Sequence, residues 1–520
     1  TPMIKVKVVS VLRRAAAFEL ENDAAYRAPE PFTVALNGED RGTFDRNVFS
    51  LAGLEPGMCY ELRLRTPSGA QGRCAFVTPR ETALLNVQDF GAVGDGAADC
   101  TAALQAAISV CPPGGTVRVP AGDYLTYPLF LRSDVLLYLE RGARLLGGPD
   151  RRRYPVLPGM VQNSDGTETS YGTWEGNPLD CYASLLTAVD AKNVAVAGEG
   201  TVDGNAAAAD WWQDPKHRRG AWRPRTLFFN RCRSVTLLGV TVCNSPSWTI
   251  HPYYCDGVDV LDVTVHNDPT SPNTDGCDPE SCANVRILGT RISVGDDCIA
   301  IKSGKYYMGL VHPAPSRRII VRNCLLERGH GAVVVGSEIA AGASDLTIER
   351  CQMRGTDRGL RVKTRRGRGE GSVITGIVCA HIRMEDVKTP FVVNMFYFCD
   401  PDGHSDYVRC RQPLPVDELT PCVGTLELSD ITCTGCEYAG GYLCGLPERP
   451  VGSVTMEDVC FTFRPDAGAG HPAMMDDTEP VSRLGLWAMN VAVLTLRNVR
   501  FTGCQGEPVR CEGVTCLTCE

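Results

Sequence analysis

The stretches "VTLLGVTV" (residues 235–242) and "VDVLDVTV" (residues 258–265) share one spacing of apolar residues. In each stretch two short runs alternate apolar and other residues, and a bend separates the two runs. Alternation with a period of two is typical of a β-strand that buries one face. Each stretch therefore predicts two strands that meet at a corner.

The same spacing returns along the C-terminal half of the chain. It begins again at Val285, Ile319, Leu346, Ile377, Leu426, Val454 and Leu494. No helix-length amphipathic segment separates these units, which excludes solenoids that alternate strands and helices. A β-sandwich would need Asn-Gly or Asp-Gly turns between most strands, and such turns are scarce here. The pattern predicts an all-β chain, a right-handed parallel β-helix whose coils lie about 4.8 Å apart.

Two further segments complete the predicted fold. Residues 1–80 alternate like strands, and Leu54, Pro56 and Tyr60 match the tyrosine-corner signature of fibronectin type III sandwiches. We therefore expect a small β-sandwich over 1–80 and the β-helix over 85–520. An open β-helix end needs a cover, and we expect a short helix over Thr101 to Val110, with Asp99 as its N-cap, to supply it.

Composition limits the function classes. The chain has 520 residues and a formal net charge of −9, which argues against generic nucleic-acid or anionic-membrane binding. No apolar run approaches the ~18 residues of a membrane span, and Arg13 and Arg14 interrupt the apolar start that a signal peptide would need.

The 25 cysteines are odd in number and irregular in spacing, unlike a disulfide framework. The inward apolar positions of the repeat include Cys324, Cys351, Cys379 and Cys433. A thiol there acts as a small hydrophobe. These observations predict reduced thiols and a cytoplasmic location. The pairs in "CTGC" (433–436) and "CLTC" (516–519) lack partner pairs at zinc-finger spacing.

An acidic cluster lies in "SPNTDGCDPESCANVRILGTRISVGDDCIAIKSG" (residues 271–304). Asp275 and Asp296 are about one coil apart, and Asp297 follows directly. His330, in "GHG", and the "RVK" of residues 361–363 each come about one coil later. We expect all of them on one outer face. Three such carboxyls suit glycoside hydrolysis, and a separation of about 6.5–9.5 Å would leave room for water and predict inversion.

The alternation in "RVK" points Val362 into the core and Arg361 and Lys363 outward together. Two adjacent cations suit recognition of a sugar carboxylate. Each motif alone has a plain structural reading, since the Asp of "NTDG" is often a turn former and "GHG" often a turn. One coil apart in this order, they indicate a site.

In this order, "NTDG", "GDDC", "GHG" and "RVK" resemble the signatures of the family 28 glycoside hydrolases, the polygalacturonases. The resemblance implies inverting hydrolysis of the α-1,4 links of polygalacturonate, without cofactor or metal. It implies that Asp296 is the general acid, that Asp275 and Asp297 activate water, and that His330 supports the acid. It also assigns the binding of a galacturonate carboxylate to the cations of "RVK".

Further substrate contacts come from the same resemblance. They are Asn273, Trp248, His251 and Tyr397. The sandwich and the "NSPSWTIHPYYCD" stretch (residues 244–256) are similar to bacterial exo-acting members, in which inserted loops close one end of the groove. Segments 150–190, 204–226 and 395–423 are the candidate walls, so we expect release of single galacturonates from acidic oligosaccharides.

Several alternatives stay open. An endo-polygalacturonase, or a hydrolase of rhamnogalacturonan or xylogalacturonan, would use the same motifs. A pectate lyase shares the β-helix but needs calcium, and a non-catalytic carbohydrate-binding β-helix is a third class. The oligomeric state and the role of the N-terminal module are not fixed by the residues.

Overall fold

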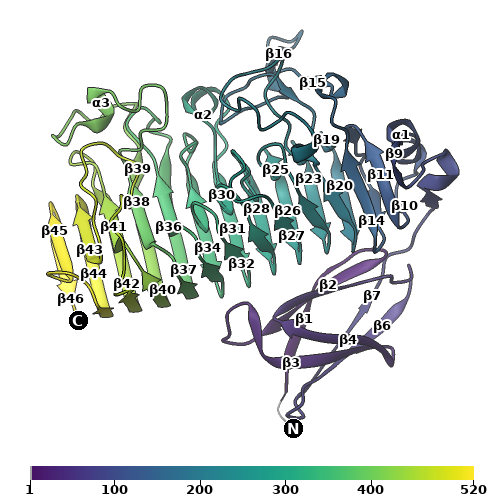
Figure 1. Ribbon diagram of the computed structural model, residues 1–520, viewed down its shortest axis with the longest axis horizontal. Coiled ribbons are helices and arrows are strands. Elements are labelled where there is room, and N and C mark those ends of the chain that lie inside the picture. Colours follow the sequence, from purple (N-terminus) through teal and green to yellow (C-terminus); the bar gives the residue numbers. More distant parts are fainter. Residues whose placement is uncertain (1–2) are drawn as a thin grey trace.

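The computed structural model describes residues 3–520 of the chain. A long stack of parallel coils makes up most of the molecule, and a smaller sandwich of strands lies beneath the N-terminal part of the stack (Figure 1). The expected β-helix and β-sandwich are therefore both present.

The first side of each coil belongs to a continuous parallel sheet. Its strands are β10 (Gly115–Val119), β13 (Val135–Leu139), β20 (Lys192–Gly198), β23 (Arg233–Leu238), β26 (Asp256–Leu261), β28 (Ala283–Leu288), β31 (Ser316–Arg322), β34 (Ala343–Glu349), β37 (Val373–Glu385), β40 (Thr425–Cys436), β42 (Val451–Phe463), β44 (Val491–Thr502) and β46 (Cys516–Cys519). The four strands from β37 to β44 are long because they run on around the corner.

The second side follows that corner. Its strands are β11 (Gly122–Thr126), β14 (Ala143–Gly147), β21 (Thr201–Asp203), β24 (Thr241–Cys243), β27 (Thr264–His266), β29 (Arg291–Ser293), β32 (Leu325–Glu327) and β35 (Gln352–Arg354). Strands β8 (Leu84–Asn86) and β9 (Asp95–Asp99) begin the first two sides.

The third side carries the predicted site. Its strands are β12 (Leu129–Phe130), β19 (Leu186–Val189), β22 (Leu227–Asn230), β25 (Ile250–Tyr253), β30 (Ile299–Ile301), β33 (Val333–Val335), β36 (Arg358–Lys363), β38 (Thr389–Asn394), β41 (Ala439–Cys444), β43 (Leu484–Met489) and β45 (Val509–Glu512). Single bridges of Cys277 to Ile250 and to Ile299 connect its two parts.

The register confirms the repeat. The first residues of the repeated units pair with one another in one unbroken ladder, Val235, Val258, Val285, Ile319, Leu346, Ile377, Leu426, Val454 and Leu494. All of them are at most 2% exposed. Identical apolar positions thus stack from coil to coil and form one core along the whole stack.

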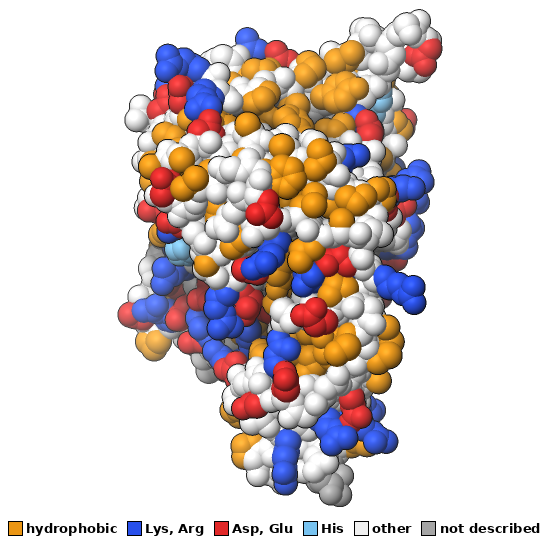
Figure 2. Space-filling view, turned by 90° about the vertical axis from the view of Figure 1, so that its right-hand side faces the viewer, with side chains coloured by type: hydrophobic (Ala, Val, Ile, Leu, Met, Phe, Trp, Pro, Cys, Tyr) orange, Lys and Arg blue, Asp and Glu red, His pale blue; other side chains and the backbone are white. Residues whose placement is uncertain are grey.

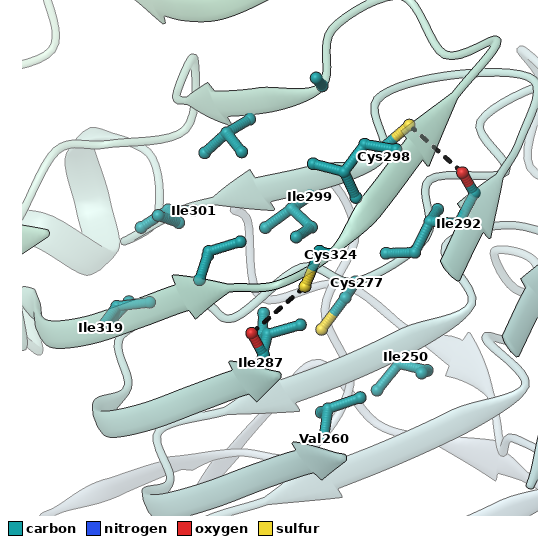
Figure 3. Packing of buried hydrophobic residues seen from close by; sticks show 14 of the residues in the cluster. Ile250, Val260, Cys277, Ile287, Ile292, Cys298, Ile299, Ile301, Ile319 and Cys324 are labelled. Atoms are coloured by element: carbon teal, nitrogen blue, oxygen red, sulfur yellow. Dashed lines mark hydrogen bonds between the residues drawn. The ribbon is translucent and has the colours of Figure 1, made fainter. Parts of the chain in front are cut away.

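Thiols fill part of this core, as predicted. Cys324, Cys351, Cys379 and Cys433 are buried, and none of the 25 cysteines, all within the described residues, is in a disulfide. Figure 3 shows Cys324 among the stacked aliphatic side chains, where its Sγ donates to the carbonyl oxygen of Ile287 at 3.3 Å. Burial raises the pKa of the Cys379 thiol to about 12, so it stays protonated.

Helix α1 (Thr101–Val110) has the predicted bounds and covers the first coil. Leu104 and Ile108 pack into the core. The predicted N-cap is wrong, because Cys100 occupies that position. Asp99 instead accepts hydrogen bonds from the backbone N–H and the hydroxyl of Thr101 at its start.

The N-terminal module is a sandwich of two antiparallel sheets. One sheet has the order β1 (Lys5–Val11), β2 (Ala15–Glu21), β5 (Val48–Ala52); the other has the order β4 (Glu39–Arg46), β3 (Arg27–Leu36), β6 (Cys59–Arg65), β7 (Gln71–Val77). The predicted tyrosine corner is present, since the Tyr60 hydroxyl accepts the backbone N–H of Glu55 at 2.8 Å.

The three-stranded sheet packs on the first side of the β-helix. Ala15, Ala17 and Val48 of the sandwich form one buried apolar cluster with Leu238 and Leu261 on the outer surface of the β-helix. Charged side chains of both signs lie around this junction (Figure 2). An ion pair also joins the two parts, with Arg46 of the sandwich 3.4 Å from Asp262 of the β-helix. In the described part of the chain, no helix has the length and apolar character needed to span a bilayer.

Candidate active site

Three carboxyls meet on the turns that lead into the third side of neighbouring coils. One side-chain oxygen of each of Asp275, Asp296 and Asp297 lies within 4.8 Å of the other two. The backbone sets this arrangement, because the N–H of Gly276 donates to the carbonyl oxygen of Asp297 at 3.0 Å and so joins the two coils. The predicted clustering is therefore present.

Asp297 is bound by the two predicted cations. The Lys363 ammonium donates to its Oδ2 at 3.1 Å, and Arg361 Nη1 lies 3.7 Å from its Oδ1. Val362 points into the core, as the alternation predicts. Arg361 and Lys363 are nevertheless only 2% and 6% exposed, because loops cover this face. Alternation predicted the direction of these side chains but not their burial.

Neighbouring Asp296 and Asp297 titrate in opposite directions. Burial and the negative charge of Asp297 raise the pKa of Asp296. Burial would also raise the pKa of Asp297, but Lys363 and Arg361 outweigh it and lower that pKa to about 2. One carboxyl thus holds a proton in the range where the other is ionised, which is the requirement for a general acid beside a base.

Asp275 has a further acidic neighbour that the sequence reading missed. Burial, followed by the charge of Asp278, raises the pKa of Asp275 well above its ordinary range. Asp278 is fully buried, and neither of its oxygens has a hydrogen-bond partner among residues 3–520. Two close carboxyls in one desolvated site favour sharing a proton. Asp278 lies two residues after the "NTDG" motif of residues 273–276, and this position was the available signal.

His330 lies at the rim of the cluster. Its backbone N–H donates to the carbonyl oxygen of Asp296 at 2.9 Å, which places the two residues on adjacent coils. Its Nδ1 lies 3.6 Å from Asp296 Oδ1, too far for a hydrogen bond. The imidazole is about half exposed (53%), so it faces the open side of the site.

Three of the four further predicted substrate contacts divide into two groups, and the fourth, Asn273, accepts a hydrogen bond from Arg223 through its Oδ1. The ring of Tyr397 lies 5.1 Å from the Lys363 ammonium and so belongs to the cationic part of the site. His251 is fully buried, its Nε2 is 3.1 Å from Glu280, and its ring packs against Trp248. The two rings of the second group therefore lie beneath the surface of the site.

A second ionic cluster was not predicted. Lys302 lies 2.5 Å from Glu338 and 4.9 Å from the centre of the Trp248 ring. Its strand register places it directly beside Glu280. The coil spacing could have predicted the position of Lys302, since "AIKSG" (residues 300–304) continues the strand that begins after "GDDC".

The three aspartates also have the spacing of a cation site. The Lys363 ammonium already neutralises Asp297 at 3.1 Å, however, which leaves less negative charge for a bound ion. The donor set fits acid–base chemistry on a sugar better than metal chelation.

Comparison with known proteins agrees with this geometry. The family model "Glycosyl hydrolases family 28" matches residues 160–407, and the model "Rhamnogalacturonase A/epimerase, pectate lyase-like" matches residues 84–164. A "Probable polygalacturonase" of Vitis vinifera is 32% identical over 379 residues, which is 71% of this chain and 72% of that protein.

Two solved structures share the fold. The family 28 exopolygalacturonase of Yersinia enterocolitica has a TM-score of 0.71 at 19% identity and covers 100% of this chain and 98% of its own. An exopolygalacturonase of Thermotoga maritima has a TM-score of 0.63 at 26% identity, covering 81% and 92%. With its acidic cluster, its cationic pair and these matches, the chain belongs to glycosyl hydrolases family 28 and is a glycoside hydrolase.

Proposed function

We propose that this enzyme hydrolyses the α-1,4 links of polygalacturonate and removes single galacturonates from a chain end. The observation that carries the proposal is the cluster of Asp275, Asp296 and Asp297 beside Arg361 and Lys363, in which the pKa of Asp296 is raised and that of Asp297 is lowered. The cations supply recognition of a sugar carboxylate, and the carboxyls supply the chemistry.

Each residue then has a role. Asp296 donates its proton to the glycosidic oxygen as the bond breaks. Asp297 is the base that takes a proton from the attacking water, because its pKa is lowered to about 2, whereas burial and the charge of Asp278 raise the pKa of Asp275, which orients that water by a hydrogen bond. Arg361 and Lys363 bind the carboxylate of the sugar next to the scissile bond, because they are the cations nearest to the carboxyls.

Exo action is supported by the loops above the third side. Two of the expected wall segments, 150–190 and 395–423, meet at Lys305. Its backbone N–H donates to the carbonyl oxygen of Gly176 at 3.0 Å, and its ammonium lies 3.2 Å from Asp400. Segment 204–226 also joins this wall, because the rings of Trp222 and Trp174 stack 4.8 Å apart. These loops stand on the same side of the stack (Figure 1).

Inversion is the proposed stereochemistry, although the spacing differs from the expected one. The nearest carboxyl oxygens are within 4.8 Å, closer than the roughly 6.5–9.5 Å between carboxyl groups that the sequence reading required. The carboxyls are close because Asp275 lies on the turn of one coil, and Asp296 and Asp297 lie on the corresponding turn of the next coil. Proton NMR of the first product formed decides the point, because inversion gives the β-anomer and retention gives the α-anomer.

A time course on a defined, reducing-end-labelled galacturonate oligomer tests the function. Unlabelled monomer alone from the outset supports exo action, and mixed oligomers support an endo enzyme. Full activity in a chelator, without a rise in ultraviolet absorbance, excludes the calcium-dependent lyase. If Asp296→Asn leaves turnover unchanged, the assigned general acid is wrong. If the wild type itself has no turnover on this substrate, the chain is a binding protein.

We also propose that the enzyme works in a reducing compartment on imported oligogalacturonides. Support comes from the buried thiols of the coil core, which pack as small hydrophobes. Cell fractionation with an antibody against the native protein tests the location, and recovery from the culture medium contradicts it.

A further inference from the structure

A single glutamate lies at the tip of a hairpin in the wall segment 150–190. Glu175 and Gly176 form a two-residue turn between Trp174 and Asn177, whose backbones exchange hydrogen bonds of 2.9 and 3.0 Å. Building on the proposed exo action, we propose that the Glu175 carboxylate recognises the free 4-hydroxyl of the terminal galacturonate at the non-reducing end.

The backbone at Glu175 is unfavourable for a glutamate. Its φ is +45° and that of Gly176 is +81°, the left-handed conformation at both turn positions. Turns of this kind favour Asn or Gly at the first position. Among the described non-glycine residues with positive φ, mostly Asn, Asp, Arg and Ser, Glu175 is the only glutamate. A residue kept where its backbone is strained points to a role for its side chain.

The hairpin tip is held firmly against the site. Trp174 is 6% exposed, and its ring stacks on Trp222 with an interplanar angle of 8°. A Cβ on Gly176 would lie 2.8 Å from the backbone nitrogen of Lys305 and 2.9 Å from Cγ of Glu338. The tip therefore touches the third side directly, and glycine is required there.

The cations around Glu175 are already engaged by other groups. Lys302 pairs with Glu338 at 2.5 Å, and Lys305 pairs with Asp400 at 3.2 Å. The third cation, Arg223, donates to the carbonyl oxygens of Pro246 and Pro272, both at 2.9 Å. Across residues 3–520, the Glu175 carboxylate has no hydrogen bond or ion pair of its own, which leaves an acceptor for a ligand hydroxyl.

The position of this acceptor relates it to the carboxyls that act on the substrate. The turn at Glu175 and Gly176 lies against Glu338, and Glu338 pairs with Lys302. Lys302 directly follows β30, the strand that Asp296 and Asp297 lead into. A sugar held between Lys302 and the aspartates would thus present its far side to the hairpin. A glutamate at this position would recognise the end of the substrate rather than the bond that breaks.

A carboxylate suits the recognition of a chain end. The 4-oxygen carries a proton only in the terminal sugar, and inside the chain it is linked to another sugar with its own negative carboxylate. Glu175 would accept a hydrogen bond from the first and repel the second. The 4-hydroxyl has one fixed configuration, whereas the anomeric hydroxyl at the reducing end interconverts between two, so a rigid acceptor suits the non-reducing end.

The test compares saturated trigalacturonide with its 4,5-unsaturated analogue, which lacks the 4-hydroxyl. We expect the wild type to favour the saturated substrate by about 100-fold or more in kcat/KM, as for sites built around one substrate hydroxyl. Glu175→Ala and Glu175→Asn should reduce this ratio to within about fivefold. Asp165→Asn, an exposed carboxylate in the same wall segment, should leave it unchanged.

Stability provides a second readout. Glu175→Asn should raise the melting temperature, since Asn tolerates the left-handed turn, while the discrimination is lost. An unchanged ratio in both Glu175 variants, or a wild type that does not discriminate, overturns the assignment. If the wild type releases mixed oligomers, exo action itself fails; if it releases only monomer while the Glu175 variants keep the ratio, only the role of Glu175 fails.

Discussion

At the level of single residues, two adjacent aspartates have pKa values shifted in opposite directions, which suits the proposed chemistry. Asp297 is bound by the cations of β36, whereas Asp296 is buried beside the charge of Asp297. The difference in pKa arises because the two side chains have different surroundings, and the cations that act on Asp297 come from β36, two coils further along the stack. The following two predictions test this division.

Asp296→Asn should lower kcat by about 10²–10⁴-fold, the usual contribution of general acid–base catalysis, with little change in oligogalacturonate affinity. The asparagine keeps the shape of the side chain but has no proton to give. Steady-state kinetics and calorimetric titration measure the two quantities. Equal losses in both would mean that Asp296 holds the substrate rather than protonating it.

Lys363→Met should move both limbs of the pH profile of kcat/KM to higher pH. Lys363 lowers the pKa of Asp297, which must be ionised, and that of Asp296, which must be protonated. Removing the cation raises both values, so the rise on the acid side and the fall on the alkaline side both shift upward. Lys192→Met, an exposed lysine on β20, is the control, and unmoved limbs would contradict the assignment.

At the level of elements, the stack is held by ladders of identical inward positions. Cys351 lies at the corner between β34 and β35, in the coil between those of Cys324 and Cys379, and its side chain is fully buried. A thiol serves there because it is small and apolar enough to fill the space between stacked aliphatic residues.

Replacing this thiol separates size from polarity. Cys351→Ser should destabilise the fold by about 1–3 kcal/mol, because a hydroxyl loses more hydration than a thiol on burial. Cys351→Val should cost less, and Cys59→Ser, at an exposed position, should be neutral. Chemical denaturation measures the free energies, and a neutral Cys351→Ser would show that the position is not part of a dry core.

At the level of the whole molecule, the sandwich is attached to the β-helix by apolar and ionic contacts. Glu19 is 1% exposed, although it lies in a strand of the sandwich. It accepts from Arg322 Nε and Nη2 of the β-helix at 2.8 and 2.9 Å, and from Asn323 at 3.0 Å. Such an enclosed ion pair fixes the orientation of the two parts.

Glu19→Ala should lower stability by about 3 kcal/mol, because it leaves the guanidinium of Arg322, whose side chain is only 15% exposed, with fewer partners. Glu19→Ala with Arg322→Ala should cost less than the sum of the two single changes. Thermal denaturation of the four proteins measures the coupling. Additive losses would show that the pair does not join the two parts.

The sequence by itself determined the coil, its register and the gathering of the site. The alternation from Val235 onward indicates which side chains enter the core. Because the coils stack in register, residues at the same position of successive repeats lie next to each other in space. For that reason Asp275, Asp296, His330 and Lys363 could be placed together from their spacing alone.

Only the tertiary structure decided how that site is enclosed. The burial of Arg361, the nearness of the three carboxyl oxygens, the neighbours Asp278 and Lys302, and the hairpin tip at Glu175 depend on contacts between distant segments. Loops without periodicity carry no signal of what they will cover. Their final positions come from side-chain packing such as the Trp174 and Trp222 stack, which exists only once the coils are assembled.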